Sequence, residues 1–211
     1  MSEPSIPGPA YRIHTRRLVL RCWEPADASL AKATIDVNIQ HLLPWLPWAA
    51  GHPQDLQEHI ERLRTWRSKF DQGQDFVYGV FDRDETCVLG GSGLHIRSRS
   101  TDAREIGYWI HKDFTSQGLA TELSAALTRV AFEIDHVRRV EIHCLPENRR
   151  SAAVPRRLGF SHEATLHKRI PMEDGSEGNV MIWTLFANDY PNTPSAAAQI
   201  EAFDAAGRRI I

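Results

Sequence analysis

The spacing of apolar residues in the first third of the chain changes from strand-like to helix-like. Residues 18–23 alternate apolar and polar side chains, which predicts a strand. Pro25 suits the first turn of a helix, and we predict that this helix runs to about Val37. Residues 41–48 contain two prolines that a regular helix does not accommodate, so we predict a loop there. A longer amphipathic helix is predicted from Pro53, because four apolar residues share one face: Leu56, Ile60, Leu63 and Phe70.

The pattern after residue 76 is that of strands separated by helices. Residues 76–81 and 87–96 flank a polar turn, which predicts a hairpin, and residues 104–111 predict a third strand. A helical period then begins at Ala120 and reaches Ile134. The remaining predicted elements are a strand at 140–144, a short helix from Asn148 to near Gly159, and two strands at about 161–170 and 179–186. This order predicts a mixed α/β domain with helices packed on a sheet.

The length of the chain fits one domain with a substantial core, and we find no internal repeat. The 211 residues include 42% hydrophobic and 25% charged side chains, which is ordinary for a soluble protein. We predict a flexible tail at residues 1–10 and a single domain at 11–190. Residues 191–211 are predicted to be a C-terminal tail whose Ala-rich part is a candidate helix.

Charge, hydropathy and cysteine content exclude several classes of protein. A formal net charge of -2 argues against a nucleic-acid binder that depends on positive charge, and no apolar run approaches the length of a membrane span. The first residues lack a signal-peptide pattern, and the scattered Cys22, Cys87 and Cys144 predict reduced thiols in a cytoplasmic protein. The ten histidines show no ligand spacing such as His-x-x-x-His, so we predict no metal.

A loop of small residues joins the third of these strands to the helix after it. Residues 115–121 (TSQGLAT) allow backbone N–H groups to approach an anion, and the helix N-terminus adds a partial positive charge. A pyrophosphate is the natural ligand for such a loop. The alternative is an ordinary strand-to-helix turn that uses Gly118 for its conformational freedom, since the loop alone is a weak signal.

The order of several short motifs resembles the GNAT acetyltransferase superfamily, and within it the ribosomal-protein N-terminal acetyltransferase (RimJ/RimL-type) branch. Residues 105–110 (EIGYWI) precede the loop, and residues 145–151 (LPENRRS) follow the next strand. Residues 158–160 (LGF) close the unit, and the resemblance extends from residue 15 to about residue 186. It implies a central, mostly antiparallel sheet with a splayed strand pair and helices on both faces.

The resemblance also implies a site for acetyl-CoA as co-substrate. Pantetheine would pair with the exposed backbone at Trp109 and Ile110, and Asn148 matches the family asparagine that hydrogen-bonds the pantetheine arm. The pyrophosphate would be held by the backbone of the loop, which comprises Thr115, Ser116, Gln117, Gly118, Leu119, Ala120 and Thr121. For Asn148, an ordinary helix N-cap is the alternative.

Two positions depart from the family pattern. A Gln or Arg usually stands three residues before the first loop glycine, where this chain has Thr115, so one side-chain contact is lost while backbone binding is kept. Pro155 falls inside the helix that starts at Asn148, and it leaves the carbonyl of Ser151 without its helical donor. We therefore predict a kink or an early end of that helix.

Acyl transfer to an amine requires removal of an ammonium proton, stabilisation of an oxyanion and protonation of the leaving thiolate. We predict that Glu105 serves the first step, directly or through water; its alternative is a surface charge paired with an arginine. Many family members protonate the sulfur with a tyrosine on the helix after the asparagine, but residues 148–160 contain none. Ser151 is the candidate in this branch, and a water or a purely structural first-turn serine are the alternatives. Cys144 has no indicated base, so we interpret it as a buried strand thiol.

The predicted loop at 41–48 lies where this fold shapes the acceptor pocket. His41, Trp45 and Trp48 are therefore candidates for binding an amphipathic amine or a peptide N-terminus, with core packing as the alternative for the tryptophans. We predict an N-acetyltransferase that acts on a protein N-terminus or a small-molecule amine by direct attack. The other function considered is a non-catalytic acyl-CoA binder or sensor; a nucleotide-binding module is disfavoured because no Walker lysine follows Gly118. Nucleic acid and membrane are not expected partners, and a homodimer stays open.

Overall fold

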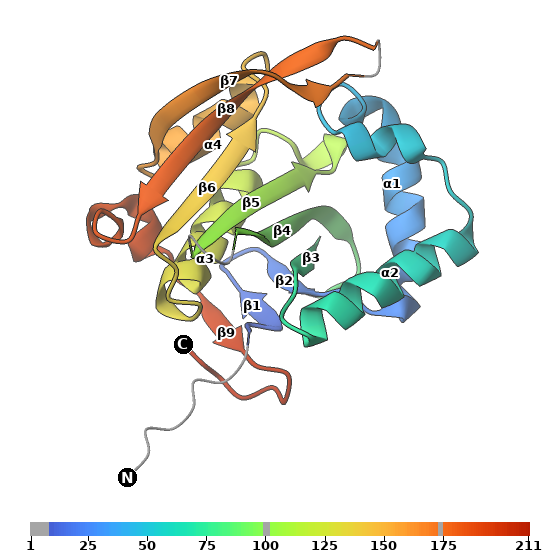
Figure 1. The fold of residues 1–211 in the computed structure, drawn as a ribbon. Coiled ribbons are helices and arrows are strands. Elements are labelled where there is room, and N and C mark those ends of the chain that lie inside the picture. Colours follow the sequence, from blue (N-terminus) through green and yellow to red (C-terminus); the bar gives the residue numbers. More distant parts are fainter. Residues whose placement is uncertain (1–8, 99–101, 173–174) are drawn as a thin grey trace.

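One sheet organises the computed structural model, which describes residues 9–98, 102–172 and 175–211 (Figure 1). The strand order in this nine-stranded sheet is β7-β8-β6-β5-β4-β3-β2-β1-β9. The strands are β1 (Arg12–His14), β2 (Val19–Cys22), β3 (Phe76–Phe81), β4 (Val88–Ser98), β5 (Ala103–Ile110), β6 (Arg139–Cys144), β7 (Ser161–Pro171), β8 (Glu177–Phe186) and β9 (Glu201–Phe203).

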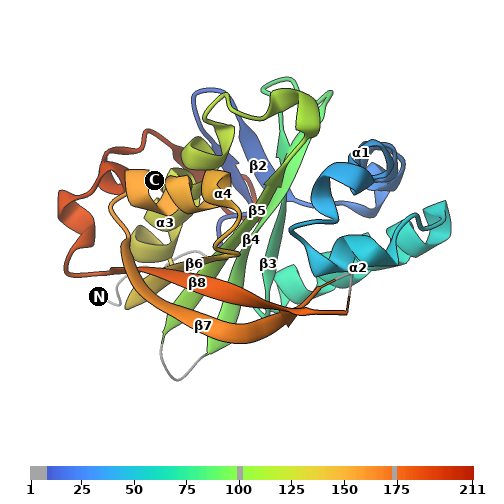
Figure 2. The ribbon, with the colours of Figure 1, turned by 90° about the horizontal axis from the view of Figure 1, so that it is seen from above.

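Helices cover both faces of the sheet, as Figure 2 shows from above. On one face lie α1 (Ala28–Leu42) and α2 (Leu56–Asp71), and on the other lie α3 (Leu119–Glu133) and α4 (Arg149–Arg157). Leu123 and Leu127 of α3 are fully buried in the larger core, while Leu63 of α2 packs in a smaller core with Trp23. Short 3-10 turns complete the connections: η1 (Pro25–Asp27), η2 (Pro47–Gly51), η3 (Lys112–Phe114), η4 (Tyr190–Asn192) and η5 (Pro194–Ala197).

The strands β5 and β6 form the splayed pair. They are parallel and pair only where Ala103–Glu105 lies beside Arg139–Glu141, although β5 continues to pair with β4 as far as Ile110. The other pairings among the described strands are antiparallel. The predicted fold, a mostly antiparallel sheet with a splayed pair and helices on both faces, is confirmed.

The first helix is longer than the sequence pattern predicted. It was expected to end near Val37, but α1 runs to Leu42, so His41 belongs to its last turn and not to a loop. Ile39 and Leu42 are buried and continue the apolar stripe of the helix. Leu43, the C-cap, keeps helical angles and donates its N–H to the Ile39 carbonyl, and the helix ends there because Pro44 has no N–H to continue the series.

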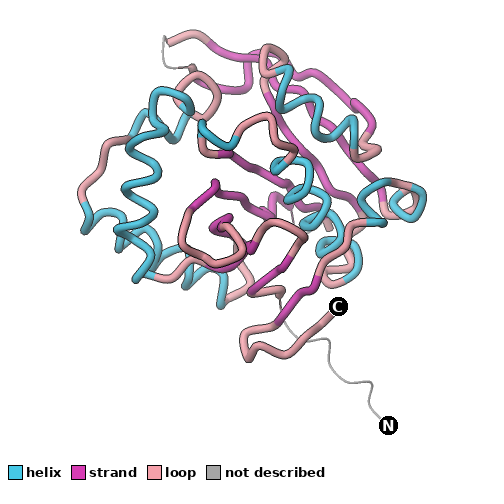
Figure 3. The backbone as a smooth tube through the Cα atoms, turned by 180° about the vertical axis from the view of Figure 1, so that it is seen from behind, coloured by secondary structure: helices cyan, strands magenta, loops and turns pink. Residues whose placement is uncertain are grey.

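Both ends of the chain differ from the predicted tails where the structure describes them. Residues 1–8 of the expected N-terminal tail lie outside the described residues, but Ala10 is fully buried and its carbonyl accepts a hydrogen bond from Tyr78 at 2.9 Å. Residues 191–211 are not a loose tail: their Ala-rich part contains the 3-10 turn η5, β9 pairs antiparallel with β1, and Ala202 is fully buried. Figure 1 shows β9 beside β1, and in the view from behind the last strand and the loop after it lead to the C-terminus (Figure 3).

No helix in the described ranges has the length and apolar character needed to cross a membrane.

Candidate active site

A cavity of about 1600 Å³ follows the split between β5 and β6. It reaches the N-terminus of α3 and the first turn of α4 on one face of the sheet, and the segment between α1 and α2 on the other. All the site residues predicted from the sequence line this cavity except Gln117. Sequence reasoning therefore found where the cavity lies, while the roles of the individual residues stay predictions.

The loop before α3 has the backbone conformation of an anion-binding turn. Ser116 and Gly118 have positive φ angles of 62° and 80°, which turn successive N–H groups toward one side. Gly118 is also the N-cap of α3, so the free N–H groups of that helix begin here. Gly118 lines the cavity, whereas the Gln117 carbonyl accepts a hydrogen bond from Arg17 Nη1 at 2.9 Å. Every residue of the loop except Gln117 therefore borders the cavity.

Arg17, between β1 and β2, braces this loop from outside the cavity. Its Nε lies 2.7 Å from Glu122 Oε2 in the first turn of α3, and its backbone N–H donates to Glu122 Oε1 at 2.9 Å. Thr15 Oγ1 donates to the same carboxylate at 2.6 Å. These contacts tie the start of α3 to the β1–β2 turn, and the only sequence signal for them was the position of residues 15–21 within the family resemblance.

Glu105 lies at the paired end of the split, where its side chain is 14% exposed. Arg97 holds the carboxylate from β4, with Nε 2.8 Å from Oε2 and Nη2 3.2 Å from Oε1. His143 Nδ1, on β6, lies 3.3 Å from the same Oε2. Glu105 is therefore paired with an arginine, as the surface-charge alternative expected, and it also lines the cavity, as its proposed role as a base requires.

His143 is a site residue that sequence reasoning missed. Its Nε2 lies 2.9 Å from Glu141 Oε2, so the imidazole sits between two carboxylates. Burial opposes protonation, but the hydrogen bond to Glu141 and the charge of Glu105 raise the pKa of His143 above its ordinary value. The signal was its alternation with Val140 and Ile142, which puts His143 and Glu141 on the face of Glu105.

The first turn of α4 presents Ser151 to the cavity. Asn148 caps the helix, because its Oδ1 accepts a hydrogen bond from the Ser151 N–H at 3.0 Å. Pro155 lies inside α4, which continues past it to Arg157 with Leu158 as C-cap, so the helix ends near Gly159 as the sequence pattern predicted and Pro155 does not end it early. The Ser151 carbonyl, which Pro155 leaves without a helical donor, accepts from Tyr108 Oη at 3.1 Å.

Tyr108 also contacts the side chain of Ser151, with 3.0 Å between Oη and Oγ. Burial raises the pKa of Tyr108 above its ordinary value, so the phenol is neutral at working pH. Cys144 lies nearby at the end of β6, and burial raises the pKa of its thiol to about 11. Cys144 is therefore a protonated thiol at neutral pH, in agreement with its interpretation as a strand residue.

Aromatic residues form the wall opposite the loop. Trp48, in η2, is 41% exposed, and its ring centroid lies 6.4 Å from that of Trp109 on β5. A Cβ at Gly91 would lie 2.5 Å from Trp109 Nε1, so a glycine is required for the indole to lie against β4. His41 and Trp45 line the same wall, and burial lowers the pKa of His41. The wall suits an apolar or aromatic group of an acceptor.

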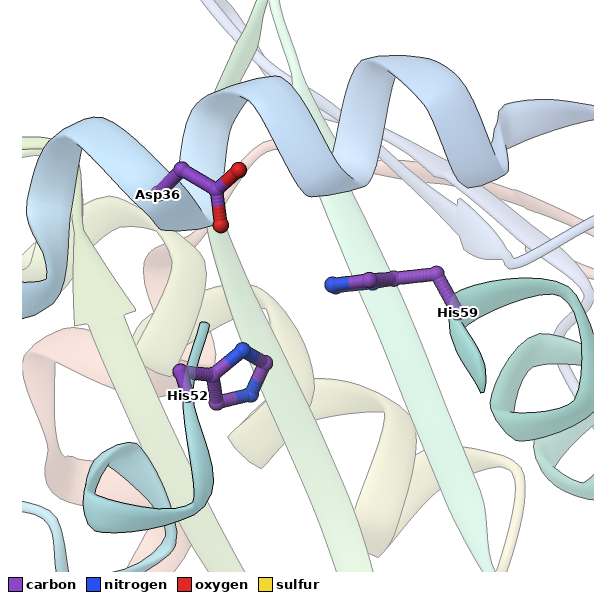
Figure 4. A group of neighbouring side chains, drawn as sticks. All are labelled: Asp36, His52 and His59. Carbon is purple, nitrogen blue, oxygen red and sulfur yellow. The ribbon is translucent and has the colours of Figure 1, made fainter. Parts of the chain in front are cut away.

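Asp36, His52 and His59 form a second polar cluster between α1 and α2 (Figure 4). Their ligand-type atoms lie within 4.8 Å of one another, and the side chains point toward a common space. Within the described residues, no hydrogen-bond partner is found for Asp36 Oδ1, His52 Nδ1 or either ring nitrogen of His59. The sequence could not indicate this cluster, because its members come from three separate segments.

The surroundings of this cluster favour a neutral hydrogen-bonding group over a cation. Arg62 Nη1 lies 2.8 Å from His52 Nε2, and a guanidinium can only donate, so the His52 proton belongs on Nδ1, which faces the cluster. A metal ion needs a lone pair at that atom. Lys32 already pairs with Asp36 Oδ2 at 2.6 Å, and burial with the Arg62 charge lowers the pKa of His52 to about 4.

Comparison with known proteins gives one family. Residues 17–161 match the sequence profile described as the acetyltransferase (GNAT) domain. The chain is 32% identical to YdaF of Bacillus subtilis, which is named for ribosomal N-acetylation, over 69% of this chain and 79% of that protein. It is 29% identical to the ribosomal protein uS5-alanine N-acetyltransferase of Escherichia coli, over 74% of this chain and 80% of that enzyme. The structure is similar to that of RimL, a ribosomal L7/L12 α-N-protein acetyltransferase in complex with coenzyme A, with a TM-score of 0.75, 21% identity, and coverage of 82% of this chain and 95% of that one.

Proposed function

Because the chain belongs to the GNAT acetyltransferase family, we propose that it transfers an acetyl group from acetyl-CoA to the N-terminal α-amine of a protein. One observation carries the proposal: the split between β5 and β6 opens into a cavity with polar groups at two positions. Glu105 and His143 lie at its paired end, while Ser151 and Tyr108 meet across its open part. The cavity therefore offers a carboxylate and a hydroxyl to a substrate bound between the strands.

The co-substrate is placed along the split in this proposal. Pantetheine pairs with the backbone of Trp109 and Ile110, where β5 has left β6, and Asn148 contacts its amide groups. The pyrophosphate meets the backbone of residues 115–121, whose positive-φ residues and helix N-terminus suit an anion. A backbone N–H of β5 donates to the thioester carbonyl and stabilises the oxyanion that develops there.

Acyl transfer then proceeds by direct attack. The amine nitrogen bonds to the thioester carbon, and the carbonyl electron pair moves to oxygen. Glu105 takes the amine proton, directly or through a water, and Arg97 and His143 keep the carboxylate in place. The oxyanion electron pair re-forms the C=O bond as the C–S bond breaks with its electron pair on sulfur, and Ser151 Oγ gives its proton to that sulfur. Solvent then carries the amine proton from Glu105 to Ser151, so the net reaction is balanced.

A protein N-terminus is the acceptor that the observations favour. The cavity volume of about 1600 Å³ exceeds the roughly 300–1,000 Å³ of ordinary small-molecule pockets, which leaves room for a peptide beside the co-substrate. Trp45 and Trp48 line the end of the cavity nearest α1 and α2 and suit the first side chains of a peptide. Two relatives named for ribosomal N-acetylation and ribosomal protein uS5 acetylation support this choice.

Mass spectrometry of a peptide library incubated with the protein and acetyl-CoA tests this function. Peptides with a free α-amine should gain one acetyl group, and the same peptides with a blocked N-terminus should not. Modification of small amines alone would contradict the acceptor class. Binding of CoA without any acetyl transfer would instead support the sensor alternative.

Two variants test the proposed roles in the reaction. Ser151→Ala should lower kcat on the order of 10²-fold while acetyl-CoA affinity changes little, because the serine acts in the transition state. Glu105→Gln should lower kcat by a similar factor, because an amide cannot take the amine proton. If Ser151→Ala keeps more than about half of the wild-type rate of chemistry, water donates the proton instead.

A further inference from the structure

The helix α4 contains a defect at the residue proposed to donate the proton. Pro155 has no N–H, so the carbonyl four residues earlier, that of Ser151, has no donor within the helix. A carbonyl that is buried without a partner costs free energy, and the turn that carries it is free to shift. The donor that the structure supplies comes from another strand.

Tyr108 reaches this carbonyl across the split. It stands three residues beyond Glu105, the last β5 residue that pairs with β6, so it belongs to the part of β5 that has separated from β6. Its Oη lies 3.1 Å from the Ser151 carbonyl oxygen and 3.0 Å from Ser151 Oγ. The single phenol hydroxyl therefore contacts both oxygens of the serine.

We propose that Tyr108 is a positioning residue: its hydroxyl replaces the N–H that Pro155 lacks and thereby fixes Ser151 against the thioester. This inference rests on the proposed function, in which Ser151 protonates the leaving thiolate. The helix lacks the tyrosine that many GNAT enzymes place on it, and Tyr108 brings a phenol to the same turn from β5.

The role of Tyr108 is that of a hydrogen-bond donor and not of an acid. Burial raises the pKa of the Tyr108 phenol, so the neutral phenol is the stable form. The neutral phenol donates its one proton to the Ser151 carbonyl at every working pH, and its oxygen accepts from Ser151 Oγ until that hydroxyl turns to the leaving sulfur. Removal of the phenol oxygen should therefore change the rate of chemistry and leave the pH–rate profile unshifted.

Single-turnover measurements of acetyl transfer test this role. Tyr108→Phe should lower the single-turnover rate about tenfold, equivalent to about 1.4 kcal/mol in the barrier, while the Kd of acetyl-CoA stays within about twofold. Tyr190→Phe is the matched control: Tyr190 Oη donates to Glu133 Oε1 at 2.7 Å and Tyr190 does not line the cavity, so its loss should leave the rate unchanged. An unchanged rate in Tyr108→Phe would overturn the proposal.

The variant Pro155→Ala tests whether Tyr108 acts by replacing the missing backbone N–H. Alanine restores a backbone N–H that donates to the Ser151 carbonyl, so Tyr108→Phe in this background should lower the rate less than about threefold. In a Ser151→Ala background, Tyr108→Phe should add less than about twofold, because no hydroxyl is left to position. A tenfold lower single-turnover rate for Tyr108→Phe in either background would overturn the proposal, because Tyr108 would then act independently of its hydrogen bonds to Ser151.

A measurement without catalysis separates this inference from the proposed function. Urea unfolding should show that Tyr108→Phe destabilises the wild-type background more than the Pro155→Ala background. This difference in destabilisation does not depend on catalysis. If it is found but no acceptor is acetylated, the proposed function is refuted and the role of Tyr108 as a hydrogen-bond donor is kept. Equal destabilisation in both backgrounds would refute the hydrogen-bond exchange on which the role of Tyr108 depends.

Discussion

Replacement of Gly118 by valine tests the pyrophosphate loop directly. Gly118 has a φ of +80°, a conformation that a β-branched residue rarely adopts. A Cβ at this position would lie 3.6 Å from Arg17 Nη2, which is ordinary van der Waals contact. The first cost of the substitution is therefore backbone strain, and the loop relieves it by leaving the conformation that presents its N–H groups.

The size of the effect follows from that strain. A left-handed backbone costs a non-glycine residue roughly 1–2 kcal/mol, and more when the side chain is β-branched. If acetyl-CoA binds only the loop conformation described here, its apparent Kd rises by the factor by which that conformation is depopulated. We expect Gly118→Val to raise the Kd at least about tenfold, because tenfold corresponds to about 1.4 kcal/mol.

Titration calorimetry with acetyl-CoA, supported by circular dichroism, measures this effect. Gly118→Asn should stay within about threefold of the wild-type Kd, because asparagine tolerates the left-handed conformation. Gly207→Val is a control for strain alone: Gly207 has a φ of +73°, nothing within 4 Å of its Cβ position, and no part in the cavity. Wild-type affinity in a folded Gly118→Val protein would refute the placement, and equal losses for valine and asparagine would refute the strain argument.

Three further predictions concern the remaining parts of the site. Trp45→Ala should raise the KM of the acceptor peptide more than that of acetyl-CoA in steady-state kinetics. Equal increases of the two KM values would show that Trp45 packs in the core and does not bind the acceptor. Because the pKa of His143 is raised by Glu141 and Glu105, its protonated form stabilises the fold below its ordinary pKa of about 6.5, and this contribution is lost as the pH rises through the raised value. His143→Gln should therefore destabilise the protein more at pH 5.5 than at pH 9 in urea unfolding, and a larger loss at pH 9 would contradict that sign. Zinc should not bind the Asp36–His52–His59 cluster of the wild type in calorimetry. Arg62→Gln should permit binding, because without Arg62 the His52 proton can move to Nε2 and leave a lone pair on Nδ1; zinc binding to the wild type but not to the variant would refute this argument.

The sequence was most informative where one local pattern decides a structure. The predicted hairpin strands at 76–81 and 87–96 correspond to Phe76–Phe81 and Val88–Ser98, because alternation and a polar turn specify both strands and their connection. Asn148 begins α4 as its N-cap, since a side-chain oxygen next to the first turn satisfies a free N–H. The apolar period from Ala120 likewise marked α3, which starts at Leu119.

Features that depend on distant partners were not predicted. Residues 201–203 form a strand because β1 offers them an edge, and three residues carry no strand pattern of their own. His143 could be placed near Glu105 only after the parallel register of β5 and β6 was known. The sequence did show that Pro155 frees the Ser151 carbonyl, but the choice of Tyr108 as its partner depends on how far β5 and β6 separate.

The pairing of β1 with β9 sets an order for the folding of a newly synthesised chain. Arg12 in β1 lies opposite Phe203 in β9, so this edge of β1 has no β9 partner until residues 201–203 have left the ribosome. Until then, the nascent protein exposes a row of free N–H and C=O groups that can pair with another chain. Arrival of β9 covers this edge and buries Ala202, so a strand that lies far along the sequence protects β1 from pairing with another chain.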